Sequence, residues 1–257
     1  MKAMPESEQP YLSIVVPAFN EDLRLPRTLE LTIAYVNSRQ ISAEVVVVDD
    51  GSSDGTASVV EQMLPQNPIL RLIRNDHRGK AYTVRTGVLA ASGAYILFCD
   101  ADMATPIEEW EKLAPHFAAG YDVVIGSREG LGAVRHDEPW YRHFMGRIFN
   151  FIVRLVAVGG FQDTQCGFKA FRRAVAQDIF HRVHLYGDDA PPVQGAAVTG
   201  FDVELLFLAL KRGYRVKEVP IEWHYGAETK VHPLRDSLRN LHDAVMVRWN
   251  DLRGVYN

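Results

Sequence analysis

The sequence predicts an α/β fold with a mixed, mainly parallel β-sheet flanked by helices. Short apolar runs typical of strands alternate with longer helical patterns from residue 11 onward, which is the arrangement of that fold class. The chain has 257 residues, of which 47% are hydrophobic and 23% charged, so it is long enough to bury a core without disulfides. We expect residues 1–10 to be a flexible tail and residues 11–257 to form a single domain.

In the first half of the chain, each strand is predicted from an apolar run that ends in a polar loop. The runs are 12–16, 44–48, 69–74, 95–98 and 122–125, with helices over about 26–37 and 107–119 and a further helix that follows Lys80 and reaches about residue 91. Open α/β sheets bind ligands outside the carboxyl ends of their strands. The convergence of these polar loops at one edge therefore predicts the binding site.

The second half is predicted to add a helical side to the sheet. A helix begins at Phe201, a last strand covers 215–223 and a closing helix covers 234–253. The closing helix carries apolar residues at helical spacing, which we interpret as a packing face, and a basic side suited to a membrane surface. These apolar residues are Leu238, Leu241, Val245 and Trp249. Residues 186–200 are predicted to be an irregular loop that is either functional or mobile.

Composition excludes several classes of protein. A net charge of -4 provides no global basic field, so we expect no nucleic-acid partner. Cys99 and Cys166 are the only cysteines, which predicts two buried thiols in a reducing, cytoplasmic compartment. No apolar run reaches the roughly 18 residues of a membrane span. The nearest candidate, 144–158, carries two arginines and is expected to lie on a membrane surface at most.

The main candidate site is Asp100-Ala101-Asp102, directly after the apolar run 95–98. Alternate side chains of a strand share one face, so both carboxylates can point out of the strand's carboxyl end. Mg²⁺ and Mn²⁺ favour oxygen ligands and are often completed by substrate phosphates. The pattern therefore predicts a metal site that faces a diphosphate, and the alternative is a capped acidic loop without a ligand.

Other polar loops follow the neighbouring strands. The segment 17–21 comes after the first strand, and Asp49 and Asp50 open a loop that is either part of the site or a well-made turn. Lys80 precedes a helix, where cations and free N–H groups suit anions. The sequence has no P-loop, His-Glu-x-x-His motif, nucleophile elbow or dinucleotide fingerprint, which disfavours a serine hydrolase or a dehydrogenase.

Residues 128–154 combine local positive charge with an apolar helical stripe. Five arginines (128, 135, 142, 147 and 154) accompany three acids and several aromatic residues. This composition fits an anionic amphiphile or an anionic membrane surface. The alternative is a homodimer helix with solvated arginines. Asp163 and Gln165 follow in a glycine-bounded loop that is expected to line the cleft.

Five motifs together resemble the family 2 glycosyltransferases with the GT-A fold. They are VVPAFNE at 15–21, VVVDDGSSDGT at 46–56, DAD at 100–102, GSR at 126–128 and DTQCGFK at 163–169. FDVE at 201–204 and EVP at 218–220 with the later Trp-His pair are similar, more narrowly, to the dolichyl-phosphate or polyprenyl-phosphate β-glucosyltransferases. The resemblance covers about residues 11–253. It implies a nucleotide-sugar half, 11–127, and an acceptor half, 128–257, with a C-terminal helical extension.

The resemblance also implies a role for each matching residue. The donor side would comprise Pro17, Phe19, Glu21 and Asp49 around the nucleoside, Asp50 and Lys80 close by, Asp100, Ala101 and Asp102 at the metal and diphosphate, and Gln165 near the sugar. Arg128 and Arg142 would bind the acceptor phosphate. Asp163 would serve first of all to position the substrate, and its action as a general base is left open. A phosphomonoester is largely dianionic at pH 7, so it can attack without a strong base. Positioning by planar Arg side chains is then the larger need.

We therefore expect a metal-dependent, inverting transfer of glucose from UDP-glucose to a polyprenyl phosphate, with Mg²⁺ or Mn²⁺, at the cytoplasmic face of a membrane. One alternative uses GDP-mannose, and another uses a soluble phosphorylated acceptor. A third alternative is a sugar-nucleotide-binding module without catalysis. The residues leave open the nucleobase and sugar of the donor, the length of the prenyl chain and the oligomeric state. They also leave open whether Asp163 acts as a general base.

Overall fold

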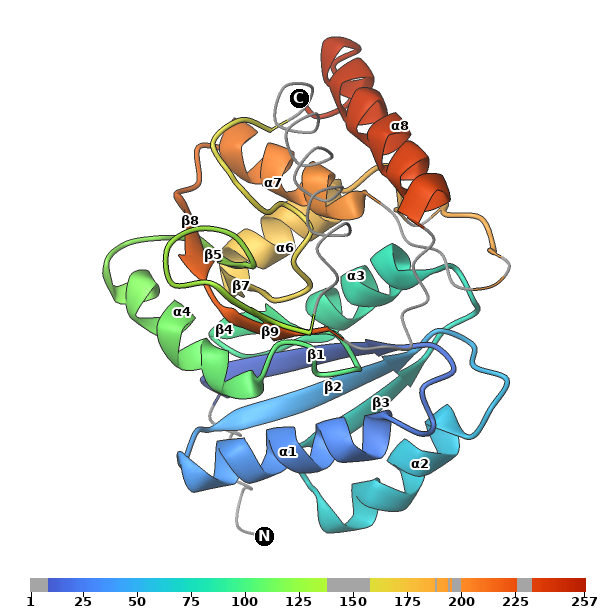
Figure 1. The fold of residues 1–257 in the computed structure, drawn as a ribbon. Helices are drawn as coiled ribbons and strands as arrows, with labels where there is room; N and C mark the ends of the chain where they lie inside the picture. The colour runs from blue at the N-terminus through green and yellow to red at the C-terminus, as the bar shows by residue number, and fades with distance from the viewer. Residues whose placement is uncertain (1–8, 138–157, 188, 194, 196–199, 226–232) are drawn as a thin grey trace, which may run out of the picture.

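The computed structural model describes residues 9–137, 158–187, 189–193, 195, 200–225 and 233–257. Its centre is a seven-stranded sheet in the order β3-β2-β1-β4-β7-β5-β8, in which β7 alone runs antiparallel to its neighbours (Figure 1). The strands are β1 Leu12–Ala18, β2 Ala43–Asp49, β3 Leu70–Arg74, β4 Tyr95–Phe98, β5 Val123–Ser127, β7 Lys169–Arg172 and β8 Val216–Pro220. The predicted mixed, mainly parallel sheet is confirmed.

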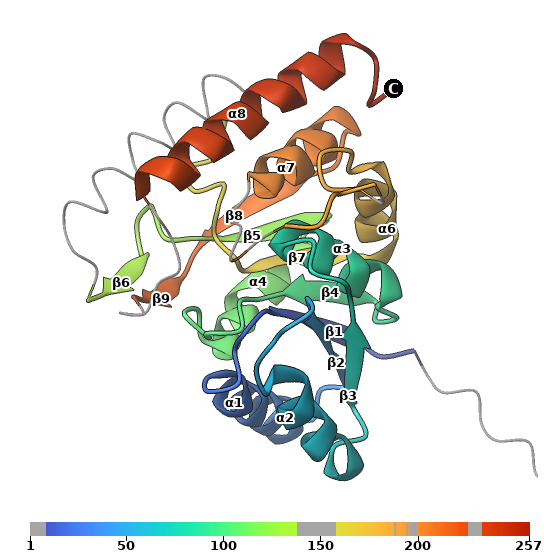
Figure 2. The ribbon, with the colours of Figure 1, turned by 90° about the vertical axis from the view of Figure 1, so that its right-hand side faces the viewer.

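Helices cover both faces of this sheet. The described helices are α1 Leu25–Ser38, α2 Thr56–Met63, α3 Lys80–Ala90, α4 Trp110–Ala118, α6 Arg173–Arg182, α7 Phe201–Lys211 and α8 Pro233–Leu252, with short 3₁₀ turns at Leu64–Gln66 and Ile107–Glu109. One apolar core lies under α1, α2 and α4, and the other lies under α3, α6 and α7. Figure 2 shows α8 along the outer side of α7.

The alternation of buried residues explains how β2 contributes to both cores. Val45 and Val47 pack in the first core, whereas Val46 and Val48 pack in the second, and all four are fully buried. A strand covered on both faces needs apolar side chains at every position. The predicted burial of the valine run on both faces is thus confirmed.

The predicted last strand, 215–223, is two strands in two different sheets. β8 ends at Pro220, and the three residues of β9, Glu222–His224, pair in parallel with β6, Val134–His136. The buried Ile221 joins them, because its N–H donates to Ser127 in the main sheet at 3.0 Å and its carbonyl accepts from Val134 at 3.1 Å. A single residue thus switches the chain between sheets, which an apolar run does not reveal.

The predicted packing face of α8 is also wrong for three of its four residues. The side chains of Leu238, Val245 and Trp249 are 69%, 49% and 54% exposed. The helix instead packs through Asn240, Asp243, Ala244, Val247 and Asn250. The Asp243 carboxylate accepts hydrogen bonds from Tyr186 Oη at 2.7 Å and from the Gly200 N–H at 2.8 Å, so polar contacts select the buried side.

Two further predictions concern membranes and thiols. None of the helices in the described part of the chain is long and apolar enough to cross a membrane. Cys99 and Cys166 are both buried free thiols, as predicted, and burial raises the pKa of Cys99 to about 12 and that of Cys166 to about 11. The membrane-surface candidate 144–158 lies almost wholly outside the described residues.

Candidate functional site

Asp100 and Asp102 lie in the turn after β4, because the strand ends at Phe98 before either acid. The Asp102 side chain is exposed, and its Oδ1 accepts the Ala104 N–H at 3.1 Å. Loss of hydration within the turn and the neighbouring Asp100 carboxylate raise the pKa of Asp102. The turn, and not strand alternation, therefore brings the two like charges together.

Lys80 supplies a cation at this turn from the first residue of α3. Its Nζ forms an ion pair with Asp100 Oδ1. Burial opposes the charged amine, but the Asp100 carboxylate, helped by Asp202 and Asp102, outweighs it and raises the pKa of Lys80. A Cβ on Gly87 would collide with Val15, so this glycine lets α3 lie close to the sheet and brings Lys80 within reach of the acids.

The acid pair fits a hard divalent cation. Both donors are carboxylate oxygens, and a cation would offset the repulsion between the neighbouring Asp100 and Asp102 charges. Within the residues that the structure describes, no third His, Cys, Asp or Glu joins Asp100 and Asp102 in a close ligand group. Mg²⁺ or Mn²⁺ held here would therefore complete its shell with water and ligand phosphates, as such ions commonly do.

A cleft of about 400 Å³ opens beside Asp102. Side chains at the start of α1 form one wall, and the segment after Asp102 forms the other. The cleft is lined by Leu23, Arg24, Arg27, Thr28, Leu31, Asp102, Met103, Pro106, Ile107 and Glu108. The Thr28 hydroxyl donates to the carbonyl of the buried Ala101 at 2.7 Å, which ties the acidic turn to α1.

Asp50 is buried and orders the turn that leads to Lys80. Its carboxylate accepts the N–H groups of Arg78 at 3.0 Å and Gly79 at 2.8 Å, and it lies 2.8 Å from His77 Nδ1. The Phe19 ring stacks on the His77 ring with centroids 3.8 Å apart. Asp50 is thus a support for the turn, and Phe19 and His77 form a flat aromatic pair beside it.

The remaining residues predicted around the nucleoside have structural contacts of their own. Pro17 is buried within β1 opposite Val48. Glu21 binds Arg24 through both carboxylate oxygens, at 2.7 and 2.9 Å. Asp49, which is 4% exposed, accepts the Ser52 N–H at 3.3 Å. All three lie at or just beyond the carboxyl ends of β1 and β2.

The fully buried Asp163 and the partly exposed Arg128 form a two-pronged ion pair. Arg128 Nε and Nη2 donate to the two Asp163 oxygens at 2.7 and 2.9 Å, and the Arg128 N–H adds a third bond at 3.0 Å. Burial alone would raise the Asp163 pKa, but the Arg128 guanidinium holds the pKa of this fully buried carboxyl well below its usual range. Asp163 is therefore a fixed anion that sets the direction of Arg128.

The loop that contains Asp163 lies directly against the acidic turn. A Cβ on Gly167 would collide with the Asp100 carboxylate, so a larger residue here would displace that carboxylate from its present position. Two buried donors of the loop, the Thr164 hydroxyl and the Gln165 side-chain amide, have no hydrogen-bond partner among the described residues. Buried polar groups are normally paired, so both donors are suited to bonds with a polar ligand. Asp163 and Gln165 are not among the residues that line the cleft beside Asp102, so their predicted place in a cleft near the sugar stays a prediction.

Sequence reasoning missed a second buried pair behind the acids. Lys169 is fully buried at the start of β7, and its Nζ lies 2.5 Å from Asp202 Oδ1 at the start of α7. Burial raises the pKa of Asp202, and the ammonium groups of Lys169 and Lys80 oppose that effect. Both residues belong to motifs noted above, GFK and FDVE, but nothing in the spacing indicates their contact. The predicted acceptor residue Arg142 lies outside the described residues.

The chain is similar to known glycosyltransferases over most of its length. The profile of the family described as Glycosyl transferase family 2 matches residues 13–180. Dolichyl-phosphate beta-glucosyltransferase of Dictyostelium discoideum is 34% identical, and the match covers 96% of this chain and 76% of that protein. The corresponding enzyme of Saccharomyces cerevisiae is 32% identical over 98% of this chain and 78% of its own length.

Two solved structures share the fold at lower identity. Glucosyl-3-phosphoglycerate synthase from Mycobacterium tuberculosis, in complex with Mn²⁺, UDP-glucose and phosphoglyceric acid, superposes with a TM-score of 0.63 at 13% identity, over 94% of this chain and 79% of that one. Mannosyltransferase PcManGT from Pyrobaculum calidifontis, in complex with GDP-Man and Mn²⁺, superposes with a TM-score of 0.57 at 20% identity. The match covers 94% of this chain and 70% of that one.

Proposed function

The chain belongs to glycosyltransferase family 2, beside the dolichyl-phosphate β-glucosyltransferases, and from that premise we propose that it transfers glucose from UDP-glucose to dolichyl phosphate or another polyprenyl phosphate. The observation that carries the proposal is the meeting of two groups at one sheet edge: the acid pair with its cleft, and Arg128 fixed by Asp163. The first group suits a metal-bound diphosphate, and the second suits a phosphate acceptor.

On the donor side, Asp100 and Asp102 would hold Mg²⁺ or Mn²⁺, which would neutralise charge on the departing diphosphate as a Lewis acid. Lys80 places a further positive charge at the same carboxylates. Phe19 offers an aromatic face beside the segment predicted to hold the nucleoside. The unpaired donors of Thr164 and Gln165 are suited to hydroxyl or phosphate oxygens of the donor.

On the acceptor side, Arg128 would orient the lipid phosphate for attack. Its guanidinium is held by Asp163 and lies 5.5 Å from the ring centre of Trp223, so its direction is set before any ligand binds. The low pKa of Asp163 makes this carboxylate a poor proton acceptor at neutral pH. We therefore assign Asp163 to positioning Arg128 and leave proton removal to the acceptor, whose phosphate is largely dianionic at pH 7.

We further propose that the outward side of α8 rests on an anionic bilayer. Its exposed apolar side chains are Leu238, Val245, Trp249 and Leu252, and its exposed basic side chains are Arg239, His242, Arg248 and Arg253. The helix keeps Asp243 buried, and Asp251 is in an ion pair with Lys211. Apolar residues including Trp beside cations are typical of helices that lie in a membrane interface, and the two described acids of the helix, Asp243 and Asp251, are buried or paired.

A transfer assay tests the donor and the acceptor together. Purified chain with Mn²⁺ is offered UDP-glucose or GDP-mannose, each with a short prenyl phosphate or with 3-phosphoglycerate, and products are weighed by mass spectrometry. We expect glucosyl prenyl phosphate as the main product. Mannosyl transfer, or transfer to 3-phosphoglycerate alone, would replace the proposal with the corresponding alternative. Binding of nucleotide sugar without any transfer would favour a non-catalytic module.

Vesicle sedimentation tests whether the outward side of α8 binds membranes, independently of the transfer assay. The double variant Trp249→Ser and Leu252→Ser is compared with Leu210→Ser, which alters an exposed leucine on α7. Since each buried large apolar side chain contributes about 1.5–3 kcal/mol, partition onto vesicles with anionic lipid should fall by at least about tenfold in the double variant only. Equal partition of all three proteins would refute this surface. The predicted cytoplasmic location and homodimer remain predictions.

A further inference from the structure

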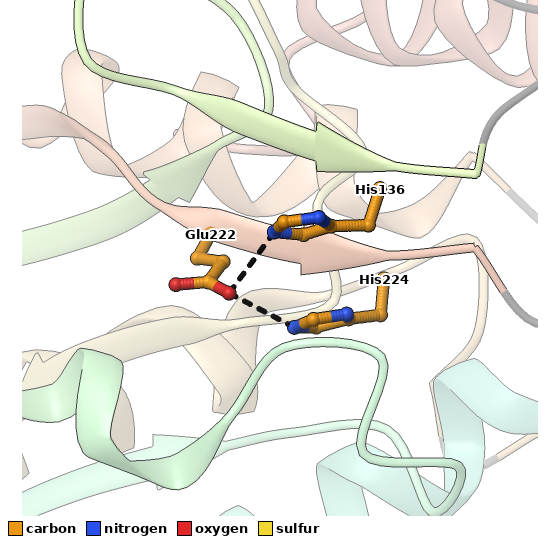
Figure 3. A group of neighbouring side chains, drawn as sticks. All are labelled: His136, Glu222 and His224. Carbon is orange, nitrogen blue, oxygen red and sulfur yellow. Dashed lines mark hydrogen bonds and ion pairs between the residues drawn. The ribbon is translucent and has the colours of Figure 1, made fainter.

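Three metal-ligating side chains lie together on the small two-stranded sheet and take no part in the function proposed above. Parallel pairing sets His136 of β6 opposite His224 of β9, and Glu222 lies two residues before His224 on the same face (Figure 3). This trio is the one close group of three or more His, Cys, Asp or Glu ligands within the described residues. The pairing joins positions 88 residues apart, so no sequence motif announces it.

The three side chains converge on one point. Nε2 of His136 and Nε2 of His224 lie 3.0 and 3.1 Å from the same oxygen, Oε1 of Glu222. The two rings are stacked, with centroids 4.4 Å apart and planes 10° apart. Ligands about 2.0–2.1 Å from a metal lie roughly 3.0–3.4 Å from one another in octahedral or tetrahedral shells. The two nitrogen-to-oxygen distances are therefore near those of a ligand shell, and all three donor atoms lie within 4.8 Å of one another.

We propose that His136, Glu222 and His224 bind a transition-metal ion of the Zn²⁺ or Co²⁺ type. Two imidazole nitrogens and one carboxylate oxygen suit such borderline ions, whereas the all-oxygen pair of Asp100 and Asp102 suits Mg²⁺ or Mn²⁺. The three side chains are 40–48% exposed, which leaves room for water ligands and a path for the ion.

The proposed site is separate from the acid pair and touches the acceptor side. Neither Asp100 nor Asp102 belongs to the ligand group, and the described link between the two regions is a backbone bond from His224 N–H to the Ala104 carbonyl at 2.7 Å. The alternate residue Trp223 points to the other face of β9, where its ring lies near Arg128. An ion that joins β6 to β9 would hold Trp223, and with it Arg128, in place.

Cobalt titration tests the site without any turnover. Tag-free full-length protein is given excess Mg²⁺, so that hard oxygen sites are occupied, and Co²⁺ is added while its visible absorption and calorimetric heat are recorded. We expect one equivalent of Co²⁺ in the wild type and at least about tenfold weaker binding in His136→Asn and Glu222→Gln. Asp102→Asn should bind as the wild type does. His181→Asn, a change at an exposed histidine of α6, is the matched control and should also bind normally.

Thermal unfolding supplies the second readout and controls for folding. In EDTA the variants should melt with the wild type, and Zn²⁺ should raise Tm in the wild type but not in His136→Asn, because only a bound ion stabilises the native state. Binding lost in Asp102→Asn and kept in His136→Asn would place the ion at the acid pair and overturn the proposal. Binding that survives every substitution would show an adventitious ion only and overturn it equally. Since neither readout uses a sugar donor, failure here leaves the proposed transfer untouched.

Discussion

Asp102 and Asp163 lie at the same sheet edge, but their surroundings shift the pKa values of the two carboxyls in opposite directions. Asp163 is fully buried, meets one guanidinium through two oxygens and has a lowered pKa. Asp102 has no guanidinium held across both its oxygens in the described contacts, and loss of hydration together with the like charge of Asp100 raises its pKa. Buried charges that are fully paired support the architecture, whereas acids crowded together at a cleft mark a ligand site. The same residue type therefore does two jobs that only the surroundings distinguish.

The largest effect is expected from Asp102→Asn. Removing one of two carboxylate ligands weakens the hold on a cation that supplies several kcal/mol of transition-state stabilisation, so kcat should fall by about a thousandfold or more. Initial rates of glucose transfer with Mn²⁺ measure this. Asp189→Asn, at an exposed acid in the 186–193 loop, should retain the wild-type rate. A fall of less than tenfold in Asp102→Asn would contradict the metal-ligand role.

Asp163→Asn should produce the largest loss of stability. The change leaves Arg128 without its anionic partner, and breaking a buried pair costs about 3–5 kcal/mol. Urea unfolding measures the loss. The matched change Asp178→Asn alters a half-buried acid that accepts a hydrogen bond from Tyr214 and pairs with Arg182 and Arg212. The two arginine side chains are 43% and 42% exposed, so about 1 kcal/mol or less is expected from these ion pairs. If the two variants lost similar amounts of unfolding free energy, the Asp163–Arg128 pair would be no more important for stability than a surface ion pair.

Arg128→Lys should affect the acceptor step more than the donor step. Lysine keeps the positive charge but lacks the planar fork that binds carboxylate and phosphate through two bonds. We expect KM for the prenyl phosphate to rise by about tenfold, which is about 1.4 kcal/mol, while UDP affinity changes by less than about twofold. Kinetics at varied acceptor concentration and UDP calorimetry give the two numbers. A parallel loss of UDP affinity would place Arg128 on the donor side.

The smallest predicted effect is the share of the pH dependence of stability that Asp163 contributes. Its pKa is lower in the folded protein than in the unfolded chain, so ionised Asp163 adds stability above about pH 4, its ordinary range, and this stability is lost as pH falls below that range. The difference in unfolding free energy between wild type and Asp163→Asn should therefore shrink from pH 5 towards pH 2. If the difference in unfolding free energy stayed constant over this pH range, the ion pair of Asp163 with Arg128 would not be the source of the pH dependence.

The sequence predicted the local features of this fold better than the distant ones. Apolar runs placed β1, β2 and β4 within about two residues of their observed bounds, since a strand covered on both faces must be continuously apolar. The four residues of β7 were missed because the strand is short and its insertion between β4 and β5 depends on non-local pairing. The β6–β9 sheet was missed for the same reason.

At the candidate site, the sequence pattern predicted where the polar loops lie but not which contacts each acidic residue makes. Asp100 and Asp102 were placed directly after a strand. The structure shows that Asp50 supports the 77–79 turn, and its predicted donor-side role stays a prediction. The contact between Asp163 and Arg128 joins residues 35 positions apart, and that between Lys169 and Asp202 joins residues 33 apart. Such pairs depend on how the sheet brings its loops together, which residue spacing alone does not encode.

The central claim is that Asp100 and Asp102 hold a metal ion that binds the donor diphosphate. Calorimetric titration of UDP into the wild type and Asp102→Asn, each with Mn²⁺ and with EDTA, tests this most directly. The account predicts that Mn²⁺ tightens UDP binding by at least about tenfold, about 1.4 kcal/mol, in the wild type and has little effect in the variant. Equal enhancement by Mn²⁺ in both proteins, or none in the wild type, would contradict it.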